Sequence, residues 1–354
     1  MPRPHRHALA IELTSRCQQR CGYCYNEWRD DNGRSVGALA GDELIALIDR
    51  ALDEVDFDQV TLTGGEPFLR HDLFDVLDAC QRRGVAIQMI SNGAMITDAL
   101  AQRLSGYSIQ SIQITLNSTE PALHNELVGG DHHADTLAGI RALVAHDVRV
   151  AGCVVVTRRN ATQVGDILDQ FRELGVTMVA LSRFSPAGFA AANVAALLPS
   201  RREMMQALGQ AQERARGGMD IQVTMPVPPC VVETSDYPDV QFSACPIGTD
   251  AQEFALGPRG ELRSCTLHHA VIGDARTTSV AALVEHPSVR GYRDVTPAFC
   301  EPCSHRATCG GGCGAAAAAV LGEARGLDPF VAQHVDDAFA QRLKQGRLRL
   351  TVLP

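Results

Sequence analysis

The sequence lacks the features that mark nucleic-acid-binding, membrane-spanning or intrinsically disordered proteins. It has no long run of lysine or arginine, and its formal net charge of −9 gives little electrostatic support for binding a polyanion. No apolar stretch approaches the ~18 residues needed to span a bilayer. Apolar residues make up 45% and charged residues 21%, which is ordinary for a folded protein with a sizeable core. We therefore predict no nucleic-acid partner and no membrane insertion.

Several common enzyme signatures are also missing. The chain shows no Ser/His/Asp set, no phosphate-binding glycine-rich loop and no internal repeat. Residues 1–7 are basic, but no long apolar segment follows them, so they do not resemble a signal peptide. We therefore expect a cytoplasmic protein whose chemistry lies elsewhere in the sequence.

Cysteine, in contrast, is abundant and clustered. Of the twelve cysteines, three lie between residues 17 and 24 and four between residues 300 and 313. Three more precede the second group: Cys230, Cys245 and Cys265. In a reducing compartment such clusters more often bind metal than form disulfides. Cys80 and Cys153 stand alone in apolar patterns, and we predict that both are buried small hydrophobic residues.

Residues 8–184 alternate short β-like runs with amphipathic helical stretches. Six strands are predicted at residues 8–13, 59–63, 85–91, 109–116, 148–157 and 177–182. Helices are predicted between them at residues 42–55, 72–83, 97–104, 134–146 and 161–174. This alternation implies parallel strands joined by right-handed crossovers, in a partial barrel or an open α/β sheet. Functional residues are then expected in loops at the carboxyl ends of the strands.

The pattern changes after Gly188. Residues 200–217 are helical and charged, residues 225–244 are rich in proline, and the remainder is rich in cysteine and glycine. A helix is predicted near 314–322 and a β-like run at 348–353. We expect three regions: an α/β unit at 1–190, a helical and proline-rich linker at 191–243, and a cysteine-rich domain with a C-terminal helix at 244–354.

The first cysteine group, Cys17-x3-Cys21-x2-Cys24, follows directly after the first predicted strand. Three thiolates on one tight loop can hold three corners of a cubane iron–sulfur cluster, which leaves one iron open to an outside ligand. A zinc site is the alternative, but it normally has four protein ligands. Because no histidine lies nearby, the residues favour the iron–sulfur interpretation.

This motif resembles that of the radical S-adenosylmethionine (SAM) superfamily, in which an aromatic residue, here Tyr23, precedes the third cysteine. Two segments at later strand ends extend the resemblance, Gly64-Gly65-Glu66-Pro67 and Ser91-Asn92-Gly93. In that family the first binds the amino group of SAM and the second lies near its ribose and carboxylate. A plain strand-to-helix turn is the alternative for the first segment alone.

The resemblance implies a [4Fe–4S] cluster that cleaves SAM reductively, so that a 5′-deoxyadenosyl radical takes hydrogen from a substrate. It also implies three further residues near SAM: Asn117, Asn160 and Arg183. One departure is Val128-Gly129, where relatives carry an Arg-Gly pair. The role of that arginine is absent or moved, with Arg158 as a candidate. From position alone, Glu12 is a candidate proton acceptor, and Tyr25 and Trp28 are expected to cover the cluster.

The later cysteines resemble a SPASM extension, the auxiliary-cluster domain found behind many radical SAM domains. The matching pattern is Cys245-x14-Gly260-x4-Cys265, then Cys300-x2-Cys303-x5-Cys309-x3-Cys313. A zinc ribbon is the alternative for the CxxC pair. By resemblance, Cys245, Cys265 and Cys313 would ligate a first auxiliary cluster, with Cys230 as a candidate fourth ligand. Cys300, Cys303 and Cys309 would ligate a second.

The last cysteine of the SPASM pattern is missing, and Phe330 stands at its place within residues 327–330. We expect the second cluster to use another ligand such as Asp328 or a histidine, to bind substrate, or to be absent. For Cys230, a buried thiol beside prolines is an equal alternative.

Together these residues predict a radical SAM oxidoreductase with a partial (β/α)6 TIM-like barrel followed by a small cysteine-rich SPASM-type domain. The favoured substrate is a ribosomally synthesised peptide, modified by crosslinking, epimerisation or oxidation. The alternatives are a small molecule, sugar or tetrapyrrole substrate, or a non-catalytic zinc or iron–sulfur scaffold. Because the first strand begins near residue 8, we expect a separate leader-peptide-binding protein, together with a reductant such as flavodoxin or ferredoxin.

Overall fold

The structure is a computed structural model that describes residues 3–26, 38–322 and 326–335. Two sequence predictions, the covering role of Trp28 and the β-like run at 348–353, lie outside the described residues.

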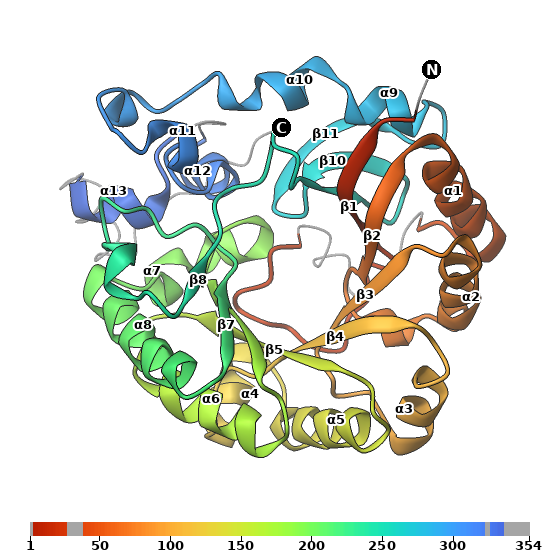
Figure 1. The fold of residues 1–354 in the computed structure, drawn as a ribbon, viewed down its shortest axis with the longest axis horizontal. Helices are drawn as coiled ribbons and strands as arrows, with labels where there is room; N and C mark the ends of the chain where they lie inside the picture. The colour runs from red at the N-terminus through yellow and green to blue at the C-terminus, as the bar shows by residue number, and fades with distance from the viewer. Residues whose placement is uncertain (1–2, 27–37, 323–325, 336–354) are drawn as a thin grey trace.

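One curved sheet of eleven strands organises the described chain, and Figure 1 shows its strands following one another around a ring. The sheet order is β11-β10-β9-β1-β2-β3-β4-β5-β6-β7-β8. All pairs from β9 through β1 to β8 are parallel, while β10 is antiparallel to both of its neighbours. The strands are β1 (His5–Glu12), β2 (Asp56–Thr63), β3 (Ala86–Ser91), β4 (Ile109–Thr115), β5 (Val150–Val156), β6 (Met178–Arg183), β7 (Asp220–Val223), β8 (Gln241–Phe242), β9 (Glu253–Leu256), β10 (Glu261–Cys265) and β11 (His268–Asp274). The predicted α/β fold with parallel strands is confirmed.

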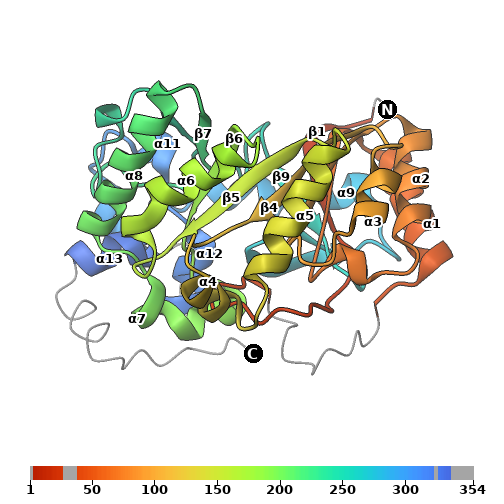
Figure 2. The ribbon, with the colours of Figure 1, turned by 90° about the horizontal axis from the view of Figure 1, so that it is seen from below.

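Amphipathic helices cover the outside of this sheet (Figures 1 and 2). They are α1 (Gly41–Glu54), α2 (Leu73–Arg83), α3 (Asp98–Leu104), α4 (Pro121–Val128), α5 (His133–Ala145), α6 (Val164–Glu173) and α8 (Arg201–Arg216). In α1 the buried side chains recur at helical spacing, including Leu44, Leu47 and Ile48. Burying each such side chain contributes about 1.5–3 kcal/mol to the free energy of folding. This periodicity made most of the helices predictable, whereas the short α4 was not predicted.

The segment expected to be a linker, residues 191–243, instead continues the sheet. Helix α8 begins with a capping box between Ser200 and Glu203, and β7 then pairs with β6 and β8 with β7. In β7 the buried residues Ile221 and Val223 alternate with exposed polar ones. Four residues are too few for that alternation to stand out in the sequence beside so many prolines.

The cysteine-rich region also joins the barrel sheet. Strand β9 pairs with β1 in parallel, with Ala8 opposite Glu253 and Ile11 opposite Leu256. The other helices of the described chain are short: α7 (Val194–Leu197), α9 (Val280–Val284), α10 (Pro287–Arg290), α11 (Arg306–Cys309), α12 (Gly314–Leu321) and α13 (Pro329–Val335). The β9–β11 hairpins therefore bring the cysteine-rich region to the first barrel strand.

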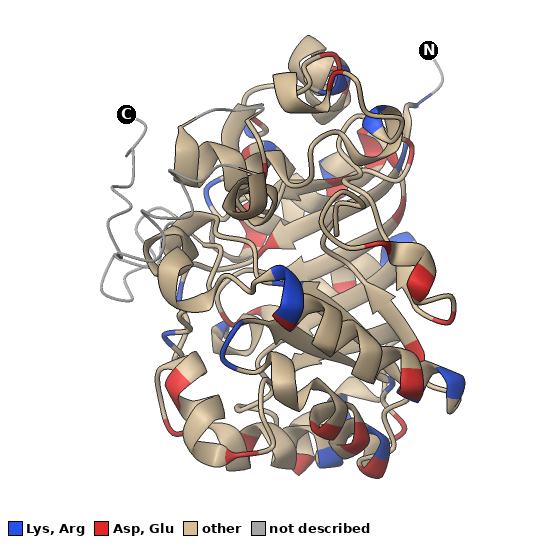
Figure 3. Cartoon of the chain, turned by 90° about the vertical axis from the view of Figure 1, so that its left-hand side faces the viewer, with Lys and Arg blue, Asp and Glu red and all other residues tan. Residues whose placement is uncertain are grey.

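Two surface properties agree with the composition. Within the described residues, no helix combines the length and the apolar character needed to cross a membrane. On the side drawn in Figure 3, acidic and basic residues are interspersed along the outer helices.

Candidate active site

The GGEP segment after β2 packs directly on the backbone that follows β1. The Gly65 amide donates to the Thr14 carbonyl at 2.6 Å, and the Glu66 amide donates to the Arg16 carbonyl at 2.8 Å. A Cβ on Gly65 would lie 2.1 Å from the Arg16 oxygen, and one on Gly64, with φ +129°, would lie 2.6 Å from the Thr14 oxygen. Glycine at both positions is therefore required by the close approach of two loops.

The Glu66 carboxylate connects the ends of β2 and β3. It accepts hydrogen bonds from the Ser91 hydroxyl at 2.8 Å, the Asn92 amide at 2.9 Å and the Phe68 amide at 3.3 Å. Glu66 is completely buried, and this burial raises its pKa to about 7 despite the three donors. The side chain thus fixes the Ser91–Gly93 turn relative to the GGEP segment.

Asn92 in turn connects that turn to the cysteine loop. Its side-chain oxygen accepts from the side-chain nitrogen of Gln18 at 2.9 Å, and its side-chain nitrogen lies 3.8 Å from the Cys17 sulfur. The cysteine loop runs through the middle of the ring in Figure 1, and Figure 2 shows it at the same end as α4 and α7. The three segments singled out in the sequence therefore meet at the carboxyl ends of β1, β2 and β3.

The three thiols of this loop are suited to a cubane cluster. Cys17, Cys21 and Cys24 are all partly exposed, and the hydroxyl of Tyr23 is hydrogen-bonded to Cys21. Burial raises the Tyr23 pKa well above its ordinary value, so the phenol stays protonated beside the thiols. Within the described residues no group of three or more His, Cys, Asp or Glu side chains is arranged for a single metal ion. A cubane is several atoms wide, so its thiolates lie further apart than the ligands of one ion.

Asn117 and Asn160 lie where β4 and β5 end, and they have different roles. The Asn160 side chain accepts from the Thr157 amide and hydroxyl and donates to the carbonyls of Asn117 and Val155 at 2.9 and 3.0 Å. The Asn117 oxygen accepts from the Val155 amide at 2.9 Å, but its buried side-chain nitrogen has no acceptor among the described residues. Asn117 can therefore donate to a ligand, whereas Asn160 positions Asn117.

The Arg183 guanidinium is fully buried and engaged by the protein itself. Its Nη2 donates to Asp328 at 2.6 Å, its Nε to the Pro226 carbonyl at 3.1 Å and its Nη1 to the Phe184 carbonyl at 3.3 Å. It also lies over the Phe330 ring. These contacts tie the end of β6 to the C-terminal region, and a role of Arg183 in binding SAM stays a prediction.

Glu12, the candidate proton acceptor, is buried in an ion pair with Arg263 of β10. Arg263 also donates to the Thr266 carbonyl at 3.2 Å and lies 3.3 Å from the His269 ring nitrogen. This ion pair links the end of β1 to β10. Proton transfer by Glu12 stays a prediction, and the polar network around it joins the barrel to the cysteine-rich region.

Comparison with known proteins decides the family. A family model described as the radical SAM superfamily matches residues 11–171, which contain all three converging segments. Residues 11–171 therefore form a radical SAM domain. This family uses a [4Fe–4S] cluster and SAM, and the three thiols between residues 17 and 24 fit the protein ligands of that cluster.

Similar proteins extend the match to nearly the whole chain. A PqqA peptide cyclase from Streptomyces rochei is 26% identical over 335 residues, covering 91% of this chain and 88% of its own. One from Xanthomonas campestris pv. campestris is 29% identical over 338 residues, covering 91% and 85%. Among solved structures, Streptococcus suis SuiB bound to the precursor peptide SuiA has a TM-score of 0.72 at 14% identity, covering 92% and 75%. Native anSMEcpe with bound AdoMet and the Cp18Cys peptide has a TM-score of 0.68 at 15% identity, covering 97% and 99%.

The cysteines predicted to hold auxiliary clusters lie in two groups. The Cys265 thiol at the end of β10 interacts electrostatically with Cys245 and Cys313, and burial raises the Cys265 pKa to about 12. Cys313, just before α12, has its pKa raised to about 11 by burial. These three are the predicted ligands of the first auxiliary cluster. Three others, Cys300, Cys303 and Cys309, follow one another through a tight turn.

Sequence reasoning missed several residues of the site because their partners are distant in the chain. Arg263 pairs with a residue 251 positions away, and its place between Gly260 and Cys265 carries no signal. The Asn26 side chain donates to the Gly64 carbonyl at 2.8 Å and is buried. The buried rings of His124 and His133 lie edge to face, 5.3 Å apart, behind Asn117. Only the structure brings these residues to the site.

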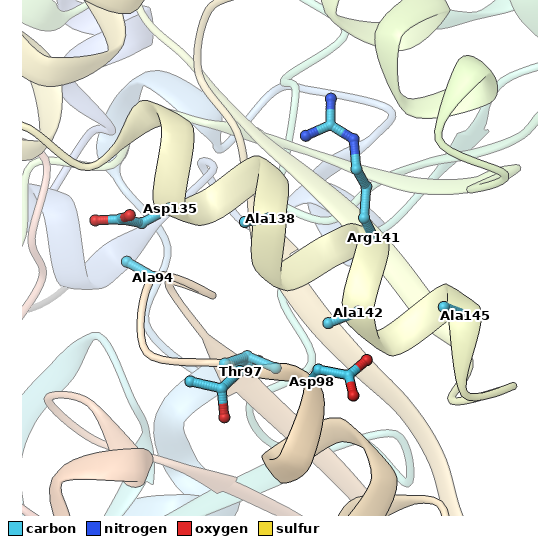
Figure 4. A pocket seen from close by; sticks show the side chains of 9 residues that line it. Ala94, Thr97, Asp98, Asp135, Ala138, Arg141, Ala142 and Ala145 are labelled. Carbon is cyan, nitrogen blue, oxygen red and sulfur yellow. The ribbon is translucent and has the colours of Figure 1, made fainter.

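A separate groove of 560 Å³ lies outside the barrel, between α3 and α5 (Figure 4). Its floor is formed by Ala138, Ala142 and Ala145 of α5, facing Thr97 and Asp98 at the start of α3. None of the cofactor motifs lines this groove, so it is distinct from the SAM site.

Proposed function

We propose that this radical SAM enzyme modifies a ribosomally synthesised peptide by crosslinking, epimerisation or oxidation. The observation that carries the proposal is the contact of Asn92 with Cys17 and Gln18, because it joins the cluster loop to the segments that resemble a SAM site. The peptide substrate is supported by similarity to PqqA peptide cyclases over 91% of the chain. Fold similarity to SuiB, solved with its precursor peptide, agrees with this assignment.

The residues of the site have separable roles in this proposal. Cys17, Cys21 and Cys24 would hold the cluster, and Gly64 and Gly65 keep the GGEP segment against the loop that carries it. When bound, the cluster and SAM supply the one-electron chemistry that removes a hydrogen atom from the substrate. The partly buried Tyr23 ring packs against the core beside these thiols, and its hydroxyl is hydrogen-bonded to Cys21.

The remaining polar groups orient the ligand. Glu66 holds the Ser91–Gly93 turn in place through two hydrogen bonds, and Asn117 offers a buried donor at the end of β4. Such preorganised donors need no rearrangement when a ligand binds. We assign Asn117 to SAM binding and Asn160 to the support of Asn117.

We further propose a cytoplasmic location, a flavodoxin or ferredoxin as the reductant, and a separate protein that binds the leader peptide. A reducing compartment keeps ten predicted ligand thiols available for clusters.

The test is SAM cleavage by anaerobically reconstituted protein reduced with dithionite. The parent should form 5′-deoxyadenosine, and a C17A/C21A/C24A variant should form none. Adding the Streptomyces rochei PqqA peptide and a panel of leader-containing precursor peptides should stimulate cleavage and give a modified peptide. Mass spectrometry should detect loss of hydrogen for crosslinking or oxidation, and uptake of deuterium from D2O for epimerisation. Iron-loaded parent protein that forms no 5′-deoxyadenosine would refute the enzyme assignment. Stimulation by a small metabolite and by none of the peptides would refute the peptide assignment.

A further inference from the structure

The cysteine set of the second auxiliary cluster is incomplete in the sequence, and the structure supplies a replacement. We propose that Cys230 is the fourth thiolate ligand of the cluster held by Cys300, Cys303 and Cys309. The inference rests on the proposed function, because it presupposes that the chain carries auxiliary clusters. It changes the expected role of Cys230, which the sequence pattern assigned to the first cluster.

The position of the missing cysteine is closed by packing. Phe330, which stands at that position, is completely buried in the main hydrophobic core. Asp328 accepts from Arg183 at 2.6 Å, from the Cys313 amide at 2.8 Å and from the Phe330 amide at 2.8 Å. Both carboxylate oxygens of Asp328 already accept hydrogen bonds, so turning Asp328 toward iron would weaken its pair with the buried Arg183 guanidinium, which is unfavourable. The segment at 327–330 therefore has a structural role, since it links the end of β6 to the loop that carries Cys313.

Contacts of the same segment also hold the loop that carries Cys230 near the cysteine-rich region. Met225 packs with Cys313 in a small buried cluster, and the Pro226 carbonyl accepts from Arg183. The chain between β7 and β8 is thus fixed to the cysteine-rich region a few residues before Cys230. This contact is made only in the folded protein, because β7 precedes Cys313 by about ninety residues in the sequence.

A tight turn then presents the Cys230 thiol. The amides of Val231 and Val232 both donate to the Pro228 carbonyl, at 2.9 and 3.2 Å. Val231 and Val232 are buried, with exposed fractions of 3% and 1%, whereas Cys230 is exposed. The two valines therefore anchor the turn in the core while the cysteine projects from it.

Backbone contacts place the 327–330 segment, and with it the Cys230 loop, beside the second cysteine group. The Asp328 amide donates to the Gly311 carbonyl at 3.2 Å, and a Cβ on Gly311 would lie 3.7 Å from the Cys300 sulfur. Cys230 is also within electrostatic range of the thiols of Cys309, Cys300 and Cys303. The Cys303 amide donates to the Cys300 carbonyl at 3.1 Å, which makes these two thiols neighbours on one turn. Four thiols from two loops match the ligand number of a [4Fe–4S] cluster.

The experiment counts iron and sulfide in anaerobically reconstituted full-length protein. The C17A/C21A/C24A variant keeps only the auxiliary clusters. It should therefore hold about 8 iron atoms per chain. Adding C230A should lower this to about 4, or convert one cluster to a three-iron form seen by electron paramagnetic resonance. C153A, which truncates a buried thiol of β5, is the matched control and should keep the full iron content.

Two further backgrounds separate the two clusters. If Cys230 belongs to the second cluster, C230A removes no further iron from a C300A/C303A variant but removes most of the remainder from a C245A/C265A variant. The opposite pattern would overturn the proposal and return Cys230 to the first cluster. Unchanged iron in C230A together with loss of about 4 iron atoms in H305A would also overturn it, because His305 would then be the missing ligand.

A measurement without any change at Cys230 guards against misfolding. Iodoacetamide should label Cys230 slowly in the reconstituted parent and rapidly in the C300A/C303A variant, as read by peptide mass spectrometry. Equal labelling in both proteins would refute the ligand role. Failure of this inference can be distinguished from failure of the proposed function. If the wild-type chain cleaves SAM and C230A keeps all of its iron, only the ligand role of Cys230 is refuted.

Discussion

Arg183 at the end of β6 and Asp328 form a completely buried ion pair, with 2.6 Å between Nη2 and Oδ2. Removing one partner leaves the other charge buried without compensation, which typically costs about 3–5 kcal/mol. We therefore expect D328A to lower the free energy of unfolding by about that amount, as measured in anaerobic urea titrations. D328N, which can still accept from the Cys313 amide, should be less destabilising.

The surface pair of Arg159 and Glu126 provides the control. Both side chains are about half exposed, so E126A should change the free energy of unfolding by less than about 1 kcal/mol. A double variant, R183M/D328L, removes both buried charges and should regain much of the stability lost in D328A. If D328A were as mild as E126A, the pair would not hold the C-terminal region to the barrel.

Gly65 tests the contact between the GGEP segment and the cysteine loop. In G65A the new Cβ would lie 2.1 Å from the Arg16 oxygen, so the two backbones must separate. We expect loss of the site-specific cluster, about 4 of the iron atoms per chain, together with loss of SAM binding measured by calorimetry. G209A is the matched control, because a Cβ on Gly209 in α8 meets no heavy atom within 4 Å. Full iron content in G65A would contradict the required close approach.

The fold could be predicted where local patterns carry it. The spacing of apolar residues in α1 and α2 and the apolar runs of β1 to β6 are properties of short windows, and the structure confirms these elements. The pairing of β9 with β1 joins residues about 245 positions apart, and no window contains both. Short strands such as β7 and β8 have too few residues to establish a period.

In the site, too, local sequence features could be predicted and long-range contacts could not. The cysteine loop, GGEP and Ser91–Gly93 could be recognised as motifs, but their physical roles could not. That Glu66 faces Ser91 and Asn92, and that Asn160 supports Asn117, depends on side-chain packing between separate strand ends. The same holds for Arg183, whose partner Asp328 lies 145 positions later. Motif spacing identifies which loops meet, and packing decides which atom faces which.

Glu66 should give the protein a pH-dependent stability. Burial raises its pKa to about 7 in the folded chain, so the folded state binds a proton more tightly than the unfolded state, where the pKa is about 4.5. Its contribution is therefore present below pH 4.5 and is lost as the pH rises through 7, by about 3 kcal/mol in total. In E66Q this loss should disappear, so the difference in unfolding free energy between E66Q and the parent should favour E66Q increasingly from pH 5 to pH 8. Parallel curves for both proteins would show that the carboxyl does not titrate in this range.

His124 should give the stability the opposite pH dependence from that of Glu66. It is completely buried, its Nδ1 faces the Asn117 amide at 3.4 Å, and its ring lies 5.3 Å from that of His133. Burial lowers the His124 pKa to about 4, from 6.5 in the unfolded chain, so the unfolded state takes up the proton first. Stability is then complete above pH 6.5 and falls by about 3 kcal/mol as the pH drops through 4. The expected sign is therefore acid destabilisation, which H124Q should reduce.

The measurement compares unfolding free energies of parent and H124Q at pH values from 4 to 7.5. H71Q is the control, because His71 is exposed and its replacement should leave the pH profile of the parent unchanged. His133 has its pKa lowered by burial as well, so H124Q should keep part of the acid sensitivity and H124Q/H133Q should keep less. If H124Q alone keeps the full acid sensitivity of the parent, then burial of His124 does not oppose its protonation. Asn117 would then contact a ring that can become charged without loss of stability.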